Sequence, residues 1–289
     1  MDYWLKIYSM KLNLKSHAKI NLALNVTGKN KSLHKIESII SFIDLHDVIS
    51  VKKTGGEKHN ISFQGKFAKG IGKKNTVQKL FQILDREKLL VNQKFRVSIT
   101  KNIPQKAGLG GGSINAASIL NVLNKKKVIK ISKNKILEVC SEIGSDVILG
   151  IEPSSSVLLS NDKIKKFLNC PILNMLLIKP NFGCATKKIY SNVTNFTKPK
   201  FNNPKKNMFG YKFLKNQSNT LEDVAISKYP QIKKIKLFLE KTNNPEFVRM
   251  TGSGSTVIAY YKSVKDCNLA KVQFKRKFKN CWLYVSKTI

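Results

Sequence analysis

Four glycines stand within five positions, at Gly108 and at residues 110–112, and they separate two segments of different periodicity. Before them, apolar and polar side chains alternate over residues 95–100, which is typical of a half-buried strand. After them, Ser113 is predicted to cap a helix whose apolar residues recur at helical spacing. A flexible linker seldom joins two such elements, so the sequence predicts a strand, a tight glycine turn and a helix N-terminus.

A turn of this kind favours an anionic ligand. Its backbone amides and those of the helix N-terminus point at one spot, where the helix dipole also favours negative charge. The segment is not a Walker A loop, because no Gly-Lys-Ser/Thr closes it, and Ser113 stands where a dinucleotide fingerprint has its third glycine. Residues 104–124 are therefore predicted to form a phosphate loop of another kind.

The net charge of +36 suggests a nucleic-acid partner at first sight. Of the 53 basic residues, however, only four are arginines, whose planar fork suits base recognition better than lysine does. The lysines are also spread along the whole chain. We therefore expect a solvated basic surface, weak salt-sensitive adhesion to polyanions and no specific nucleic-acid partner.

The cysteines and the apolar runs indicate the cellular compartment of the protein. Five cysteines without a Cys-x-x-Cys pair favour neither a disulfide framework nor a zinc site, and they suit a reducing cytoplasm. No apolar run approaches the roughly 20 residues that span a bilayer, and the first residues lack the apolar core of a signal peptide. The sequence thus predicts a cytoplasmic protein with no membrane partner.

Residues 104–124 resemble the phosphate loop of the GHMP kinase superfamily, whose signature is Pro-x-x-x-Gly-Leu-Gly followed by small residues. Two further motifs occur in the same order as in that superfamily, Ala-Lys-x-Asn-Leu from Ala18 and Thr-Gly-Ser-Gly from Thr251. The longer run GLGGGSINAA is most similar to the branch that phosphorylates the 2-hydroxyl of a cytidine diphosphate-linked methylerythritol, a step of non-mevalonate isoprenoid biosynthesis. The family-like sequence begins just after Met10, which makes Met10 an alternative start.

The resemblance implies an α+β fold of two domains, with ATP and substrate meeting between them. Residues 1–160 would form the ATP-binding domain, similar to domain 2 of ribosomal protein S5, and residues 161–289 a ferredoxin-like domain. The family's ATP-binding residues match Pro104, Gly108, Leu109, Gly110, Gly111, Gly112, Ser113, Asn115, Gly252, Ser253 and Gly254. Mg²⁺ is expected with ATP because it neutralises the phosphates, although no protein ligand for it is indicated.

The resemblance also implies catalytic and substrate-binding residues. Asp146 would accept or orient the hydroxyl proton, and Lys19 would keep that carboxylate ionised by its charge. The cytidylated substrate would be bound by Asn21, His34, Thr186 and Tyr190. Without the resemblance, alternation over residues 18–26 indicates only a half-exposed strand with Lys19 and Asn21 on its polar face, and Asp146 fits a simple helix cap.

One departure from the family pattern keeps alternatives open. Ser32 and Leu33 replace the glycine and tyrosine that precede the family's histidine, and leucine has no aromatic face for a cytosine. Tyr190 is a candidate for stacking on the cytosine, and a structural role as an aromatic side chain of the core is an equally open interpretation. Another GHMP kinase, of the mevalonate or homoserine type, is the first alternative function, and a basic nucleic-acid-binding protein of related fold is less favoured. A monomer and a homodimer are both open.

Two segments carry weaker expectations. Residues 52–75, rich in lysine and glycine, are predicted to form a hairpin region, with residues 61–63 as its apolar part. Residues 194–215 are polar, contain two prolines and are predicted to form a long loop.

Overall fold

The computed structural model describes residues 11–30 and 33–289, so Met10 and Ser32 lie outside the described residues. The chain divides into two compact units. Among the described residues, unit 1 consists of those up to Ala18, Leu45–Pro104 and Gly110–Pro153, and unit 2 of those within Lys19–Asp44, Gln105–Leu109 and Ser154–Ile289. The long strands β1 (Lys11–Asn30) and β2 (Leu33–Thr54) therefore contribute residues to both units. A division into two domains near residue 160 stays a prediction.

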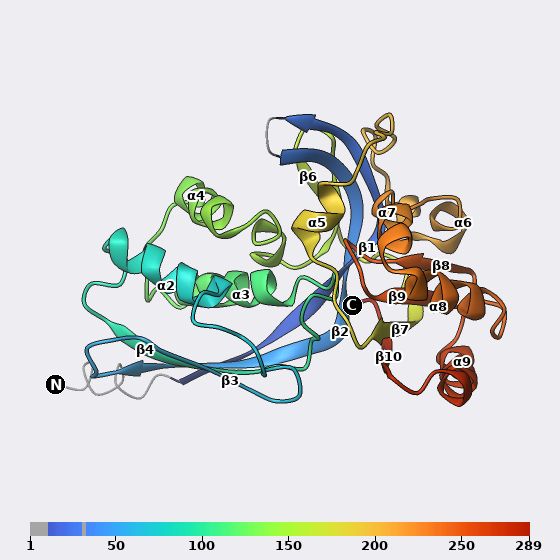
Figure 1. The fold of residues 1–289 in the computed structure, drawn as a ribbon. Helices are drawn as coiled ribbons and strands as arrows, with labels where there is room; N and C mark the ends of the chain where they lie inside the picture. The colour runs from blue at the N-terminus through green and yellow to red at the C-terminus, as the bar shows by residue number, and fades with distance from the viewer. Residues whose placement is uncertain (1–10, 31–32) are drawn as a thin grey trace. The chain divides into compact units, whose positions relative to one another are not determined.

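Unit 1 packs helices on one face of a sheet (Figure 1). Its elements besides the long strands are β3 (Asn60–Gln64), α2 (Thr76–Arg86), β4 (Lys94–Thr100), α3 (Gly111–Lys125), α4 (Lys133–Ile143) and the short helix η1 (Ile148–Gly150). β4 pairs antiparallel with the second half of β2 and parallel with β3. The expected hairpin at residues 52–75 is wrong, because β3 pairs with β4 rather than with the preceding strand β2.

Unit 2 contains a ferredoxin-like arrangement (Figure 1). Its antiparallel sheet is built from β7 (Asn174–Pro180), β8 (Phe247–Met250), β9 (Val257–Tyr261) and β10 (Cys281–Lys287), in the order β10-β7-β9-β8. The helices α8 (Pro230–Glu240) and α9 (Val264–Lys277) connect β7 to β8 and β9 to β10, which gives the β-α-β-β-α-β chain order of that fold. Their apolar stripes pack with the sheet in one core.

The remaining elements of unit 2 are short. They are β5 (Ser155–Leu158), β6 (Ile164–Phe167), α5 (Thr186–Tyr190), η2 (Lys206–Phe209), α6 (Tyr211–Leu214) and α7 (Leu221–Lys228). β5 pairs with the first half of β2 and with β6. In the part of the chain that the structure describes, no helix combines the length and the apolar character that crossing a membrane requires.

Two sequence-based expectations about these elements are wrong. Strand β1 is not half exposed: Lys19 and Asn21 are only 5% and 4% exposed, because both faces of the strand are covered from residue 18 to residue 26. The segment 194–215 is not one long loop, since η2 and α6 lie within it and Phe201 is completely buried. Helices this short show no periodicity that a sequence could reveal.

Candidate active site

Helix α3 begins inside the glycine run rather than after it. Gly110 is the N-cap, with φ +68°, and the first helical hydrogen bond runs from the amide of Ile114 to the Gly110 carbonyl (3.0 Å). The prediction that Ser113 caps the helix is therefore wrong, because glycine adopts this left-handed conformation without a Cβ penalty and starts the helix earlier. The amides of residues 111–113 precede that first bond, which is where a helix binds an anion.

The start of α3 lies against neighbouring backbone and side chains of unit 1. A Cβ on Gly111 would lie 3.0 Å from Ile103 Cγ2, and the Thr76 hydroxyl at the start of α2 donates to the Gly112 carbonyl (2.7 Å). Pro104 is buried just before the run. The glycines therefore serve close packing around the loop as well as the turn itself.

Asp47 on β2 is a residue of this region that sequence reasoning missed. Its carboxylate is fully buried and accepts hydrogen bonds from the amides of Asn102 (2.8 Å) and Ile103 (2.9 Å), from Asn115 Nδ2 (3.0 Å) and from the ammonium of Lys101. It thereby connects the end of β4 to the first turns of α3. The signal was available, because alternation along β2 places Asp47 on the same face as its buried apolar neighbours.

Asp146 lies in unit 1, in the turn that follows α4. The turn is closed by a hydrogen bond from the amide of Val147 to the Gly144 carbonyl (3.0 Å), and Asp146 is partly exposed. The chain then enters η1, where a Cβ on Gly150 would lie 2.7 Å from Ala117 Cβ on α3. Close packing of η1 on α3 thus fixes the segment that carries the Asp146 carboxylate relative to α3, whose N-terminus belongs to the phosphate loop.

Lys19 and Asn21 lie together in unit 2. The ammonium of Lys19 donates to Asn21 Oδ1 (2.7 Å), and Asn21 Nδ2 donates to the hydroxyl of Ser38 (2.8 Å). Ser38 donates onward to the Ala23 carbonyl (2.6 Å), which leaves its oxygen as the acceptor for Asn21. This chain of hydrogen bonds fixes which way the amide points and so holds the lysine beside its oxygen.

The Thr-Gly-Ser-Gly turn packs against the beginning of the phosphate loop within unit 2. Gly108, at φ +73°, would place a Cβ 2.2 Å from the Thr251 carbonyl oxygen, and a Cβ on Gly252 would lie 3.3 Å from Asn21 Oδ1. The Thr251 hydroxyl accepts from the amide of Asn21 (2.9 Å). The Leu109 carbonyl accepts from the amide of Lys19 (3.1 Å). Three motifs far apart in sequence are thus brought together here.

We expect the Gly108→Ala variant to lose stability because of this contact. The left-handed φ costs an alanine about 1 kcal/mol, and the clash with the Thr251 carbonyl adds to it. Gly70→Ala is the matched control, since Gly70 has φ +85° with nothing within 4 Å of an added Cβ. Urea unfolding compares the two variants. Equal losses of unfolding free energy would show that the close approach of Gly108 to the Thr251 carbonyl does not contribute to stability.

The predicted substrate-side residues form a second group in unit 2. The rings of His34 and Tyr190 lie with centroids 5.3 Å apart, and the hydroxyls of Thr186 and Ser253 are 2.9 Å apart. Burial, and to a lesser extent the charge of Lys29, lowers the pKa of His34 below its usual 6.5. This shift favours the neutral imidazole, which offers one hydrogen-bond donor and one acceptor.

The predicted site residues thus fall into two sets, each described within its own unit. Unit 1 holds Pro104, Gly110, Gly111, Gly112, Ser113, Asn115 and Asp146; unit 2 holds Lys19, Asn21, His34, Gly108, Leu109, Thr186, Tyr190, Gly252, Ser253 and Gly254. In the described ranges, no group of three or more histidine, cysteine, aspartate or glutamate side chains is arranged to hold a metal ion.

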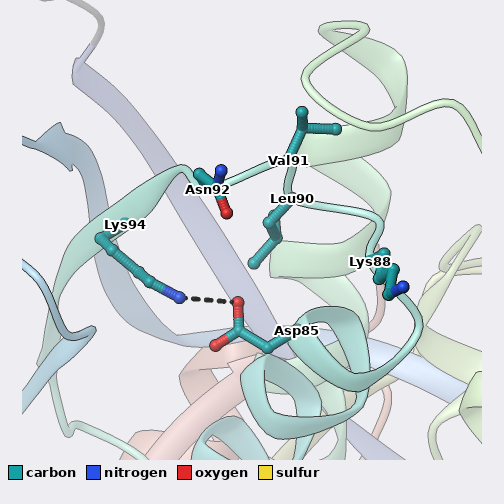
Figure 2. A pocket seen from close by; sticks show the side chains of 6 residues that line it. All are labelled: Asp85, Lys88, Leu90, Val91, Asn92 and Lys94. Carbon is teal, nitrogen blue, oxygen red and sulfur yellow. Dashed lines mark hydrogen bonds and ion pairs between the residues drawn. The ribbon is translucent and has the colours of Figure 1, made fainter.

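A separate cavity of about 430 Å³ lies in unit 1, between the end of α2 and β4 (Figure 2). It is lined by Asp85, Lys88, Leu90, Val91, Asn92 and Lys94. The ammonium of Lys94 donates to Asp85 Oδ1 (3.0 Å) across it, and Asp85 also contacts His59. It contains none of the predicted site residues, so we do not take it as the active site.

Comparisons with known proteins show which families the chain resembles. The family model described as GHMP kinases N terminal domain matches residues 75–154. Over 276 residues, the chain is 57% identical to the 4-diphosphocytidyl-2-C-methyl-D-erythritol kinase of Pelagibacter ubique, covering 96% of this chain and 98% of that protein. It is 31% identical over 288 residues to the Clostridium perfringens protein of the same name, with the same coverage of each.

Solved structures share the fold. A crystal structure of 4-(cytidine 5'-diphospho)-2C-methyl-D-erythritol kinase superposes with a TM-score of 0.77 at 20% identity, covering 96% of this chain and 99% of that one. Homoserine kinase from Cytophaga hutchinsonii superposes with a TM-score of 0.67 at 15% identity, covering 97% and 96% of the two chains. At these identities the likeness describes the fold, which is the fold that the resemblance to GHMP kinases implies.

Proposed function

Since this chain belongs to the family of 4-diphosphocytidyl-2-C-methyl-D-erythritol kinases, we propose that it transfers the γ-phosphoryl group of ATP to the 2-hydroxyl of 4-diphosphocytidyl-2-C-methyl-D-erythritol. The observation that carries this proposal is the 57% identity over nearly the full length of a relative with that name. Homoserine and mevalonate kinases share only the fold, at 15% identity or less, so the alternative acceptors are not favoured. The reaction belongs to non-mevalonate isoprenoid precursor synthesis.

The backbone of the phosphate loop and of the Thr-Gly-Ser-Gly turn binds ATP in this proposal. Residues 111–113 offer amides at the N-terminus of α3, where the helix dipole adds positive potential. Asn115 and Pro104 support the loop from buried positions. Gly108, Gly252 and Gly254 all have positive φ, so they provide backbone without side chains in unit 2.

Asp146 and Lys19 act on the reacting hydroxyl in this proposal. Asp146 accepts the proton of the substrate 2-hydroxyl while the oxygen forms its bond to the γ-phosphorus, and the bond from that phosphorus to the bridging oxygen breaks to release ADP. Lys19 supplies positive charge, and Asn21 orients it through the 2.7 Å hydrogen bond described above. Little covalent work is needed, so positioning and charge carry the catalysis.

Mg²⁺ accompanies ATP in this proposal. An ion bound mainly through phosphate oxygens and water needs only one or two carboxylates, and the described residues form no larger cage. When bound, Mg²⁺ neutralises charge on the phosphates and stabilises the transferred group.

The substrate's cytidine end is assigned to unit 2. His34 hydrogen-bonds the base as a neutral imidazole, Tyr190 offers its ring, and Thr186 contributes a hydroxyl next to Ser253. We further propose a cytoplasmic enzyme without a specific nucleic-acid or membrane partner. Monomer and homodimer both agree with this function.

An ATP-dependent phosphorylation assay tests the function. The acceptors are 4-diphosphocytidyl-2-C-methyl-D-erythritol and, in parallel, mevalonate and homoserine. We expect turnover on the cytidylated acceptor alone. Turnover on another acceptor, or on none, would remove the proposed substrate.

A further inference from the structure

His34 lies next to two aromatic side chains rather than one. Besides Tyr190, the ring of Phe196 lies with its centroid 6.4 Å from that of His34, at an interplanar angle of 48°. Phe196 is 47% exposed, so part of its ring surface is available to a ligand. Leu33, which precedes the histidine, is 75% exposed and has no ring to offer.

The segment that carries Phe196 forms no regular structure, but the residues that follow the ring are anchored to β1 and β2. The amide of Thr197 donates to the Val26 carbonyl on β1 (2.9 Å). A few residues later, the amides of Lys200 and Phe201 donate to the two carboxylate oxygens of the fully buried Glu37 (2.8 and 2.9 Å). These bonds hold the backbone against β1 and β2, so the ring is positioned before a ligand arrives.

We propose that Phe196 provides an aromatic face on which the cytosine of the substrate stacks, in compensation for the leucine at position 33. This inference deepens the proposed function and rests on it for the identity of the base. An exposed ring beside a hydrogen-bonding imidazole is suited to a flat pyrimidine, because every base has a π-face while the imidazole can pair with its edge. Phe196 acts on binding, since the base is remote from the reacting 2-hydroxyl.

The test compares steady-state kinetics of Phe196→Leu, which keeps an apolar side chain but removes the ring, with Phe196→Tyr, which keeps the ring. We expect Phe196→Leu to raise KM for the cytidylated substrate roughly 5- to 100-fold, as expected for a lost base stack, with kcat and the KM for ATP within about twofold of the parent. Phe196→Tyr and the control Leu237→Ala, at a side chain 48% exposed on α8, should match the parent. An unchanged KM in Phe196→Leu would overturn the proposal.

Calorimetric titration with CDP separates this inference from the proposed function. CDP binding requires no turnover, so it reports on the ring even if the parent enzyme fails to phosphorylate the expected substrate. We expect Phe196→Leu to weaken CDP binding by a factor similar to its KM change, and Leu33→Tyr added to it to recover most of the loss. A double variant as weak as the single one would assign the loss to a displaced segment and overturn the role of the ring.

Discussion

The Asp146→Asn variant is expected to bind ATP like the parent enzyme and to lose most of its turnover. The asparagine keeps the size of the side chain but can neither accept a proton nor carry charge, so we expect kcat to fall by roughly 10²- to 10⁴-fold. ATP affinity should hold, because the backbone amides proposed to bind the phosphates belong to α3 and not to the turn after α4. Single-turnover kinetics with ATP titration measures both quantities.

Asp162→Asn is a matched control for that experiment. Asp162 is exposed in a turn at φ +63°, a conformation that asparagine also tolerates, so the same chemical change should leave turnover unaltered. Unaltered turnover in Asp146→Asn would refute the role assigned to that carboxylate. A fall in ATP affinity equal to the fall in turnover would instead place Asp146 in nucleotide binding.

The Asp47→Ala variant is expected to lose about 3–5 kcal/mol of unfolding free energy, the usual cost of leaving one charge of a buried pair uncompensated. Lys101 would remain buried opposite the gap, and the amides of Asn102 and Ile103 would lose their acceptor. Chemical denaturation monitored by circular dichroism measures this loss. Because Asp47 also contacts Asn115 on α3, we expect the affinity for ATP to weaken as well.

A second variant isolates the charge. Adding Lys101→Met to Asp47→Ala removes the uncompensated ammonium, so we expect the double variant to recover part of the lost stability without recovering ATP affinity. Equal stability of the single and double variants would show that the carboxylate acts through its backbone contacts alone. An Asp47→Ala variant as stable as the parent would contradict the buried pair altogether.

Local elements were predicted well because their signals lie in adjacent residues. Alternation over residues 95–100 predicts a strand, and β4 occupies Lys94–Thr100. The phosphate loop was found for the same reason, because glycine spacing and the elements around it are contiguous.

Pairing between segments that are distant in the chain is harder to predict from the sequence. Whether β3 joins β2 or β4 depends on packing of the whole sheet, and short strands carry no mark of their partner. Glu37 and Asp47 lie among the buried positions of β2, which indicates a buried carboxylate, yet the backbone amides that donate to them are 55 to 164 residues away in sequence. The role proposed for Phe196 is beyond sequence reasoning for the same cause, because its neighbour His34 belongs to another part of the chain.

Unit 2 is built from segments that are far apart in the chain, and this has a consequence for synthesis on the ribosome. Its segment Lys19–Asp44 is translated early, whereas its remaining partners, apart from the short stretch Gln105–Leu109, begin at Ser154, about 110 residues later. At roughly 5–20 residues per second, these stretches of β1 and β2 wait on the order of 5–20 s for the strands and helices that cover them. Apolar side chains such as Leu24 and Val26, buried in the finished core, are exposed during that interval. Nascent chains of this protein are therefore expected to engage a chaperone while the second half is made.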